Sequence, residues 1–596
     1  MSSRAQSIAS TVRASVTPLR TRGAFRPMKR RDALLAAVLF STAAPITAAG
    51  LSAAAALATS PPLTRLYNGT ELIVQRANIA AGVVSAVAAF NAAVSIATPF
   101  LLPSNFTVMS KTALPPSGNR HDYMSLDKYY WDCRVNPNRS TAALPATSAK
   151  PDPQCERGVP LWSSKVCCVE FCGTCGGDGC SDRPGGKPGC CVTPIRDSRR
   201  LCNETDAPCV LDKPRCDANT GLPWTRHDGI TNPAMHNFDH DAMLNMTRGV
   251  LALSTAQWFA PRRSDAKRFA DACAKIMQTW FVAAATRMSP KSGLEYGHFI
   301  PGVSNGSHGS LIDIHSWSGL LDGVVLLEHR AEELNASWSS GDAAAFRAWL
   351  RQFLQWLTAS DLARQEINAT NNHGVWCDVQ ILAISLFLTD DGPHSAAAAA
   401  AAAVAARARA RVDIQIAGNE TLPAEMARTK SFSYSQFCLD AFFHLAALLE
   451  HVSPLPRAGV FNITANSAFR SRSRSPRSPS PSPSLWNYVN ALGGSIKGAL
   501  DWQLKYVIPP SPGGERRPWP GVQIEPFETC DTRDLVSQCL ASYYPLMRRA
   551  SRVWPSSESG DEQAVATLPG FATAAERAAQ PLNLLLPPNV DNSVPI

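Results

Sequence analysis

The feature that most constrains the fold of this 596-residue chain is a series of apolar faces at helical spacing. Apolar side chains recur every three or four positions in stretches that begin at Phe269, Phe346, Val375 and Tyr434. This spacing puts them on one face of an α-helix, which must bury that face against another element. We find no convincing series of alternating strands. Serial amphipathic helices with short connections therefore predict an all-α fold, an (α/α) toroid or a solenoid.

Two further segments are expected to be helical. The segment Ser395–Arg411 is almost pure Ala and Arg, a composition that favours helix. The segment Asn78–Leu102 is apolar but is interrupted by Asn91 and Ser95. We therefore interpret it as a packed helix, and not as a second membrane span.

Two low-complexity segments interrupt the helical pattern. Arg470–Ser484 alternates Arg, Ser and Pro, which in a nuclear protein would indicate a phosphorylated splicing-type repeat. Inside a helical domain this stretch, bounded at 466–485, is better interpreted as a disordered surface loop. Residues 551–596 are rich in Pro and Ala and poor in aromatic side chains, which predicts a disordered C-terminal tail.

The net charge of +9 comes from the N-terminal tail. Residues 1–31 contain eight basic and no acidic side chains, which leaves about +1 for the remainder of the chain. The charge is therefore no sign of a nucleic-acid groove, and we expect no nucleic-acid partner.

An apolar run, Ala33–Ala58, follows Lys29-Arg30-Arg31, which is typical of a signal peptide or an uncleaved signal anchor within residues 1–60.

The destination of the chain depends on how this tail is processed. Only an uncleaved anchor would hold the protein at a membrane, with the basic tail in the cytoplasm and the remainder extracellular or lumenal. Cleavage would release a secreted protein. A mitochondrial or plastid transit peptide is the alternative, because the first 31 residues are rich in Arg and Ser and lack acids.

Two features favour the secretory route. Ten N-x-[ST] sequons are spread along the chain and indicate a glycosylated surface. Twelve of the 17 cysteines lie between Cys133 and Cys216, in a stretch rich in Gly and Pro. So short and Cys-dense a stretch cannot build a hydrophobic core, which predicts a disulfide-bonded module at 133–216. Zinc is the alternative because Cys172 and Cys175 form a CxxC, but no His falls inside the block.

Two polar segments, each at the start of an expected helix, carry the candidate chemistry. They read NNHGVWCDVQ and ARTKSFSYS. A helix N-terminus carries a partial positive charge, so hydrogen-bond donors there suit an anionic ligand. Taken singly, Asn372 is interpreted as a helix cap and Arg428 as a solvated loop charge. Together with His373 and Tyr434 they supply an amide, a guanidinium, an imidazole and a phenol at two helix entrances, which favours a functional site.

These two segments, with several others in order along the chain, resemble the alginate lyase family of polysaccharide lyases. The further segments that carry the resemblance are PSGNRHDYMSL from Pro116, Tyr130-Trp131, RHDGITNP from Arg226, TRMSP from Thr286, and Arg517–Pro520. The resemblance covers roughly 65–547, less the insertions. It implies a catalytic (α/α) toroid, an incomplete barrel, built from 65–132 and 217–547, with the small disulfide-rich block inserted into it.

The resemblance also implies a reaction, β-elimination at an acidic sugar, without cofactor or metal. Such an enzyme must neutralise the uronate carboxylate, place a base at C5 and place an acid at the departing O4. By resemblance, Asn372 and Arg428 would hold the carboxylate, and Tyr434, assisted by His373, would move protons. A cation such as Arg428 near Tyr434 would help the phenol to act as a base. The further substrate-binding residues that the resemblance implies are Tyr123, Tyr296, Asn371, Trp376 and Lys430.

The chain departs from the family pattern at two positions, and two other candidates have plainer interpretations. Cys377 stands where an aromatic residue is expected, and His298 where Gln is common. The stretch from His236 to Asp241 resembles a metal cluster, but a polar helix start is favoured. Cys377, close to His373 in sequence, invites a thiol-nucleophile interpretation, but a packed free Cys is favoured.

Two functions remain open from the sequence. The first is a polysaccharide lyase that acts on an acidic, uronate-containing polysaccharide such as alginate and leaves unsaturated uronate ends. The second is a catalytically inactive cell-surface or cell-wall glycoprotein that binds acidic glycan on the same toroid. The Cys-rich block could add a carbohydrate or cell-wall contact, or could brace a neighbouring loop. Convergence of the four candidate side chains on one cleft would favour the lyase.

Overall fold

The computed structural model describes residues 60–102, 107–135, 216–389, 392–452, 484–508, 517–521, 543, 545–554 and 582–585. By its internal contacts the chain divides into Met1–Ser60 and Pro61–Ile596, and the description that follows concerns the second unit. The basic tail, the apolar run after it, the interior of the Cys-rich block and most of the loop at 466–485 lie outside the described residues.

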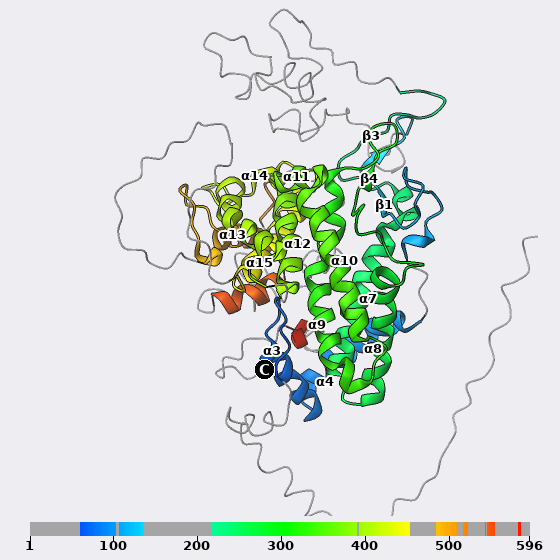
Figure 1. The fold of residues 1–596 in the computed structure, drawn as a ribbon. Coiled ribbons are helices and arrows are strands. Elements are labelled where there is room, and N and C mark those ends of the chain that lie inside the picture. The colour runs from blue at the N-terminus through cyan, green and yellow to red at the C-terminus, as the bar shows by residue number, and fades with distance from the viewer. Residues whose placement is uncertain are drawn as a thin grey trace, which may run out of the picture. The chain divides into compact units, whose positions relative to one another are not determined.

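The described part of the chain is predominantly helical, so the predicted all-α toroid is confirmed (Figure 1). The α-helices are α3 (Gly69–Ala80), α4 (Val84–Ala97), α7 (Asp239–Phe259), α8 (Arg263–Met277), α9 (Trp317–Leu334), α10 (Ser340–Ala359), α11 (Asp361–Ile367), α12 (Asn372–Phe387), α13 (Ala396–Gln415), α14 (Pro423–Met426), α15 (Ser431–Leu449), α16 (Ile496–Val507) and α20 (Leu582–Leu585). Shorter helical turns are η1 (Thr98–Leu101), η2 (Val108–Ser110), η4 (Pro233–Asn237), η5 (Gln278–Val282), η6 (His308–Ile314) and η8 (Leu485–Asn487).

Helix α12 lies at the centre of the helical layer that leads to the cleft. Every residue of α12 except His373 is buried, and its buried Asp378 is paired with Arg407 and Arg411. It packs against α9, α13 and α15, while α7 packs against α8 and α9 (Figure 1). Because α12 is enclosed on all sides, its first turn has a fixed position from which side chains reach the cleft.

The Ala- and Arg-rich segment forms the expected helix. It is α13, and its start is set by Ser395, whose Oγ accepts the backbone N–H of Ala398 at 3.1 Å. Such a cap satisfies one of the backbone donors that a helix leaves unpaired at its first turn.

The segment Asn78–Leu102 differs from the single helix that we expected. Helix α3 ends at Ala80 and α4 begins at Val84, with a turn between them in which Gly82 has a φ of +77°. Two helical stretches of the described residues are long and apolar enough to cross a membrane, Val84–Leu101 and His308–Leu334. The second of them is mostly buried inside the protein, as core helices are.

Within the expected C-terminal tail, 551–596, the structure describes 551–554 and 582–585. Residues 551–553 end a helical segment that begins at 545, and Ser551 is buried. Helix α20 packs against α3 and α4 and buries Leu584 and Leu585. The sequence argument used average composition, which does not register a short cluster of leucines that finds an apolar surface.

Two short strand pairs lie beside the helices. Strand β1 (Met124–Leu126) pairs in parallel with β4 (Tyr296–Phe299), and β2 (Tyr130–Trp131) pairs antiparallel with β3 (Thr225–Arg226). A disulfide joins Cys133 to Cys216, with their Cα atoms 5.6 Å apart. This bond closes the Cys-rich block at its base, between β2 and β3.

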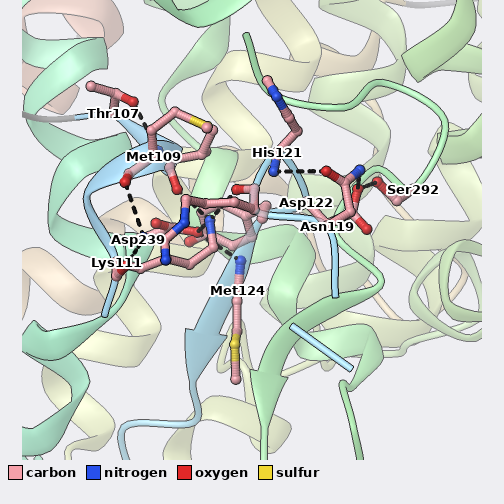
Figure 2. Close-up of polar contacts among 12 residues, drawn as sticks. Thr107, Met109, Lys111, Asn119, His121, Asp122, Met124, Asp239 and Ser292 are labelled. Carbon is pink, nitrogen blue, oxygen red and sulfur yellow. Dashed lines mark hydrogen bonds and ion pairs between the residues drawn. The ribbon is translucent and has the colours of Figure 1, made fainter. Parts of the chain in front are cut away.

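A buried ion pair fixes the segment that leads into β1 (Figure 2). Lys111 Nζ lies 2.8 Å from Asp239 Oδ2, and the same oxygen accepts the backbone N–H of Met124 at 2.9 Å. Nearby, Asp122 accepts hydrogen bonds from Asn119 at 3.1 Å and from Ser292 at 2.6 Å (Figure 2). Asp239 is the first residue of α7, so these bonds tie β1 to the helical layer.

Candidate functional site

The four side chains predicted to carry the chemistry converge on one cavity. Asn372, His373, Arg428 and Tyr434 all line a cleft of about 1080 Å³. Two of them enter from the start of α12, and Tyr434 enters from the first turn of α15. Helices α12 and α15 pack against each other and both begin at the cleft. The sequence therefore located both helix entrances correctly and the structure brings them together.

Positive charge dominates the wall of this cleft. Two carboxylates, Asp127 and Asp313, are among the lining residues. The cationic residues that line it are Lys128, Arg226, Arg248, Arg428 and Lys430. A cleft with an excess of one sign of charge on its wall concentrates ligands of the opposite sign, so this cleft suits a polyanion.

Tyr434 has two close partners in the cleft. Its hydroxyl lies 2.6 Å from the hydroxyl of Tyr129, in the loop between β1 and β2. The Arg428 guanidinium carbon lies 3.7 Å from the centre of the Tyr434 ring. Burial raises the pKa of Tyr434 above its ordinary value, more than the charge of Arg428 lowers it. Arg428 acts in the expected direction, but burial has the larger effect, so the phenol keeps its proton at neutral pH.

Arg428 is held from behind by a buried carboxylate. Its Nη2 and Nε donate to Asp228 at 2.6 and 3.2 Å, and Thr429 Oγ1 donates to the same carboxylate at 2.8 Å. Arg226 also donates to Asp228 at 2.5 Å. Burial would raise the pKa of Asp228, but Arg428 and Arg226 outweigh it and hold that pKa well below its usual range. Asp228 thus fixes the direction of Arg428. Because this one carboxylate pairs with two arginines, the group of three keeps a positive charge.

Asn372 is fully buried and is tied to Glu425. Its backbone N–H donates to Glu425 Oε1 at 2.6 Å, and its Nδ2 lies 2.9 Å from each carboxylate oxygen. Its Oδ1 has no hydrogen-bond partner among the described residues. The amide donors that we assigned to a substrate carboxylate are therefore occupied. In this structure Asn372 anchors the start of α12 to the segment before Arg428.

His373 shares a carboxylate with a second imidazole. Its Nδ1 lies 2.6 Å from Glu366 Oε1, and His308 Nδ1 lies 2.6 Å from Glu366 Oε2. Glu366 is fully buried on α11, and both histidines line the cleft. Burial would raise the pKa of Glu366, but the two imidazoles outweigh it and lower that pKa to about 2. Glu366 is therefore a carboxylate that accepts an Nδ1–H from each ring.

A second carboxylate organises another part of the wall. Asp313 accepts hydrogen bonds from Tyr123 at 2.7 Å and Ser125 at 2.8 Å, and lies 2.8 Å from His298 Nε2. His298, which stands where the family often has Gln, has a left-handed backbone with a φ of +50°. Burial would lower the pKa of His298, but Asp313 outweighs it and raises that pKa. This departure from the pattern places an imidazole paired with Asp313 on the cleft wall.

The five expected substrate contacts divide into two groups. Asn371 and Lys430 line the cleft, and Asn371 caps α12 through its Oδ1. Tyr123 and Trp376 do not line it, because both are buried in the core, at 0% and 1% exposure. Tyr296 begins β4 and is also absent from the wall. Aromatic side chains next to polar segments resemble sugar contacts in sequence, but Tyr123 and Trp376 are core residues here.

The other two candidates from the sequence, the possible metal cluster at 236–241 and the thiol of Cys377, have structural roles. Asp239 pairs with Lys111, and His236 pairs with Asp241 at 2.6 Å, as a polar helix start would. No group of three or more metal-ligating side chains occurs among the described residues. Cys377 is buried, and burial raises the pKa of its thiol well above the ordinary value, which suits a packed residue.

Five of the residues that hold or adjoin the four predicted side chains were not identified from sequence. They are Tyr129, Asp228, His308, Glu366 and Glu425. Asp228 lies inside the RHDGITNP segment and Tyr129 directly precedes Tyr130-Trp131, so the matching segments did contain a signal for these two. The other three lie in no recognised pattern, and only the fold reveals their proximity.

Comparison with known proteins agrees with this geometry. The alginate lyase family model matches residues 107–454, more than half of the chain. The crystal structure of an alginate lyase from Bacteroides ovatus superposes with a TM-score of 0.57 at 21% sequence identity, covering 88% of this chain and 99% of the other. At that identity the likeness concerns the fold alone. No curated protein gave a significant match. By the family match over more than half of its length, the chain belongs to the alginate lyase family.

Proposed function

We propose that this protein is a polysaccharide lyase that cleaves an acidic, uronate-containing polysaccharide such as alginate by β-elimination. The observation that carries the proposal is the convergence of His373, Arg428 and Tyr434 on one cation-rich cleft. Family membership and the fold shared with the B. ovatus alginate lyase support it. A protein that only bound acidic glycan would need the cations, but not a phenol and an imidazole held by dedicated partners.

The reaction places a charge requirement on the site. A base removes the C5 proton, the freed electron pair forms the C4–C5 double bond, and the C4–O4 bond breaks while O4 gains a proton. Negative charge builds up on the carboxylate as the C5 proton leaves and must be countered. Arg428 supplies a permanent charge beside Tyr434, and its Nη1 has no hydrogen-bond partner among the described residues.

The two proton-transfer roles follow from the partners of the side chains. Tyr434 keeps its proton, so in our proposal it is the acid that protonates O4. His373 donates Nδ1–H to Glu366, which leaves Nε2 as the nitrogen that can accept the C5 proton. Tyr129, 2.6 Å from the Tyr434 hydroxyl, is placed to return a proton to it.

A direct assay tests the proposal. The full chain, purified from a secreting eukaryotic host, is incubated separately with polymannuronate, polyguluronate and glucuronan, and ultraviolet absorbance of the unsaturated product is followed. We expect absorbance to rise with at least one polymer and not with a neutral glucan. Binding to these polymers without any rise in absorbance would contradict the lyase and favour the inactive glycan-binding protein.

We also propose that the chain follows the secretory route, which the ten sequons motivate. Five sequon asparagines are exposed in the described part of the chain, namely Asn68, Asn305, Asn335, Asn368 and Asn419. Protein made in a eukaryotic cell should lose mass on treatment with a peptide N-glycosidase. An unchanged mass would count against this route.

A further inference from the structure

His308 occupies a place in the cleft that neither the sequence nor the family resemblance assigned to it. It begins η6, and its imidazole is on the cleft wall beside that of His373, with ring centroids 6.4 Å apart. The His308 side chain is 30% exposed and that of His373 is 23% exposed. Both rings therefore reach the space that a ligand of the cleft would occupy.

The two rings are held by opposite oxygens of one carboxylate. Glu366 Oε2 lies 2.6 Å from His308 Nδ1, and Oε1 lies 2.6 Å from His373 Nδ1. The carboxylate has no exposed surface of its own, so it cannot meet a ligand. A buried, ionised carboxylate accepts hydrogen bonds and cannot donate them, which fixes Nδ1 as the protonated nitrogen of each neutral ring.

The other nitrogen of each ring, Nε2, is then available to a ligand in the cleft. Neither Nε2 has a hydrogen-bond partner among the residues that the structure describes. One carboxylate can offset the charge of one imidazolium but not of two. With both rings neutral, the unit of two rings and one carboxylate has a charge of −1, so one added proton brings its charge to zero while the second ring keeps a free Nε2.

Resting on the lyase activity proposed above, we propose that His308 is a second imidazole that contacts the acidic sugar, and that Glu366 is the positioning residue that presents His308 and His373 together. In this arrangement one ring hydrogen-bonds the sugar from its Nε2 while the other accepts the C5 proton. The buried carboxylate serves both rings, so a change at Glu366 affects both and a change at His308 affects one.

Kinetics distinguish these roles. In Glu366→Gln the amide can accept from one ring but donates to the other, which reverses the tautomer of that ring. We expect a loss of about 10²-fold or more in kcat, in line with other cases where a catalytic imidazole loses its orienting carboxylate. In His308→Gln we expect mainly a raised KM. The exposed His394, outside the cleft, provides the matched control His394→Gln, which should behave as wild type.

Spectroscopy tests the geometry independently of turnover. Protein labelled with nitrogen-15 in histidine should show the Nδ1–H tautomer for His308 and His373, and Glu366→Gln should convert one of them. Adding a saturated polymannuronate oligomer should shift the Nε2 signals of both rings. An Nε2–H tautomer for either ring in the wild type would overturn the proposal, and so would wild-type kcat and KM in Glu366→Gln on a polymer that the wild type cleaves.

These arms separate the inference from the function on which it rests. If the wild type cleaves no uronate polymer, the lyase proposal fails, while the tautomer measurement still decides whether Glu366 presents both rings. If the wild type cleaves a polymer and His308→Gln changes neither kcat nor KM, His308 has no contact with the sugar and this inference alone fails.

Discussion

At the scale of single residues, three of the four predicted side chains at the cleft are each held by a buried carboxylate. Asp228 holds Arg428, Glu366 holds His373, and Glu425 holds Asn372. A charge or donor with such a partner keeps one direction when a ligand arrives, and so costs little reorganisation during reaction. The carboxylates are buried behind these side chains, so the ligand meets the donors and not the carboxylates.

Removing the Tyr434 hydroxyl tests its catalytic role. Tyr434→Phe keeps the ring beneath Arg428 but takes away the proton-transferring group, so kcat should fall by about 10²–10⁴ or more with little change in thermal stability. The matched control is Tyr488→Phe, which removes a hydroxyl that donates to Asp413 away from the cleft. Initial rates of absorbance increase measure both. Near-normal turnover of Tyr434→Phe would give the leading role to His373.

Removing the charge of Asp228 tests how Arg428 is supported. Asp228→Asn leaves a buried guanidinium without its counter-charge, which should cost roughly 3–5 kcal/mol of unfolding free energy and raise KM. Asp361→Asn, which breaks an exposed pair with Arg364, is the control and should change neither. Denaturant unfolding and Michaelis kinetics measure these effects. A raised KM with unchanged stability would mean that Arg428 finds another partner.

The effect of Asp228→Asn should depend on pH with a defined sign. The pKa of Asp228 is lower in the folded chain than its unfolded value of about 3.9. Its stabilising contribution is therefore complete above that unfolded value and is lost as pH falls through the folded pKa. The difference between wild type and variant should be full at pH 7 and shrink below about pH 4.

What the sequence could and could not predict at this scale has a physical reason. His373, Arg428 and Tyr434 stand in helix-start segments, so local spacing located them. Asp228 lies 200 positions from Arg428, and Glu425 lies 53 positions from Asn372. Such pairs form only once the chain has folded, so local spacing cannot predict them. The burial of Trp376 likewise depends on how the core packs, which the sequence pattern did not show.

At the scale of elements, the entry of α12 is the critical piece of backbone. Gly374 lies in its first turn, where a Cβ atom would collide with the Ala369 carbonyl oxygen and lie 2.5 Å from Arg411 Nη1. Arg411 donates to that same carbonyl at 2.7 Å and to Asp378 at 2.8 Å. The glycine therefore permits the close packing that sets the position of His373.

A pair of Gly→Ala changes tests this. Gly374→Ala should destabilise the fold by about 1–3 kcal/mol through overpacking and, by moving His373 by about an ångström, lower kcat by about 10²-fold. Gly341→Ala in α10 is the control, because its Cβ would meet nothing closer than Ser339 Oγ at 3.5 Å. It should be neutral or stabilising by at most about 1 kcal/mol. Equal kcat for the two variants would refute the role of Gly374.

The sequence predicted helices well where the apolar periodicity extended over many residues. It predicted them less well where a single residue set the end of a helix. The long amphipathic stretches became α8, α10, α12 and α15. The break between α3 and α4 depends on Gly82 in a left-handed turn, and apolar composition across that point gave no warning of it. Short strand pairs such as β1 and β4 carry too few residues for an alternating pattern to appear.

At the scale of the whole molecule, the cleft has two differently built walls. Helices α12 and α15 supply His373 and Tyr434 to one wall. The strand pair β2–β3, which comes earlier in the sequence, supplies Tyr130 and Arg226 to the other wall. The Cys-rich block leaves from the end of β2 and returns before β3. Cys133 follows the last residue of β2 by two positions, so its bond to Cys216 lies close to the strand pair that lines the cleft.

Excising the Cys-rich block tests whether the reaction in the cleft depends on it. A variant in which residues 137–212 are replaced by a short Gly/Ser linker keeps Cys133 and Cys216, whose Cα atoms are 5.6 Å apart, and so keeps the β2–β3 pair closed. We expect its kcat to stay within a few-fold of wild type, because every described residue that lines the cleft is retained. A large loss of kcat would show that the block itself reaches the reacting sugar.

A second excision variant, which also carries Cys133→Ser and Cys216→Ser, separates the bond from the block. Without the bond, the pairing of Tyr130 with Arg226 depends on two short strands and on neighbouring hydrogen bonds, such as that from Asn232 Nδ2 to the Tyr130 carbonyl at 2.8 Å. Arg226 then holds Asp228 less firmly, and Asp228 in turn orients Arg428. The second variant should therefore bind the polymer more weakly than the first, with a raised KM and a lower melting temperature. Identical kinetics for the two variants would mean that the bond serves the block and not the cleft.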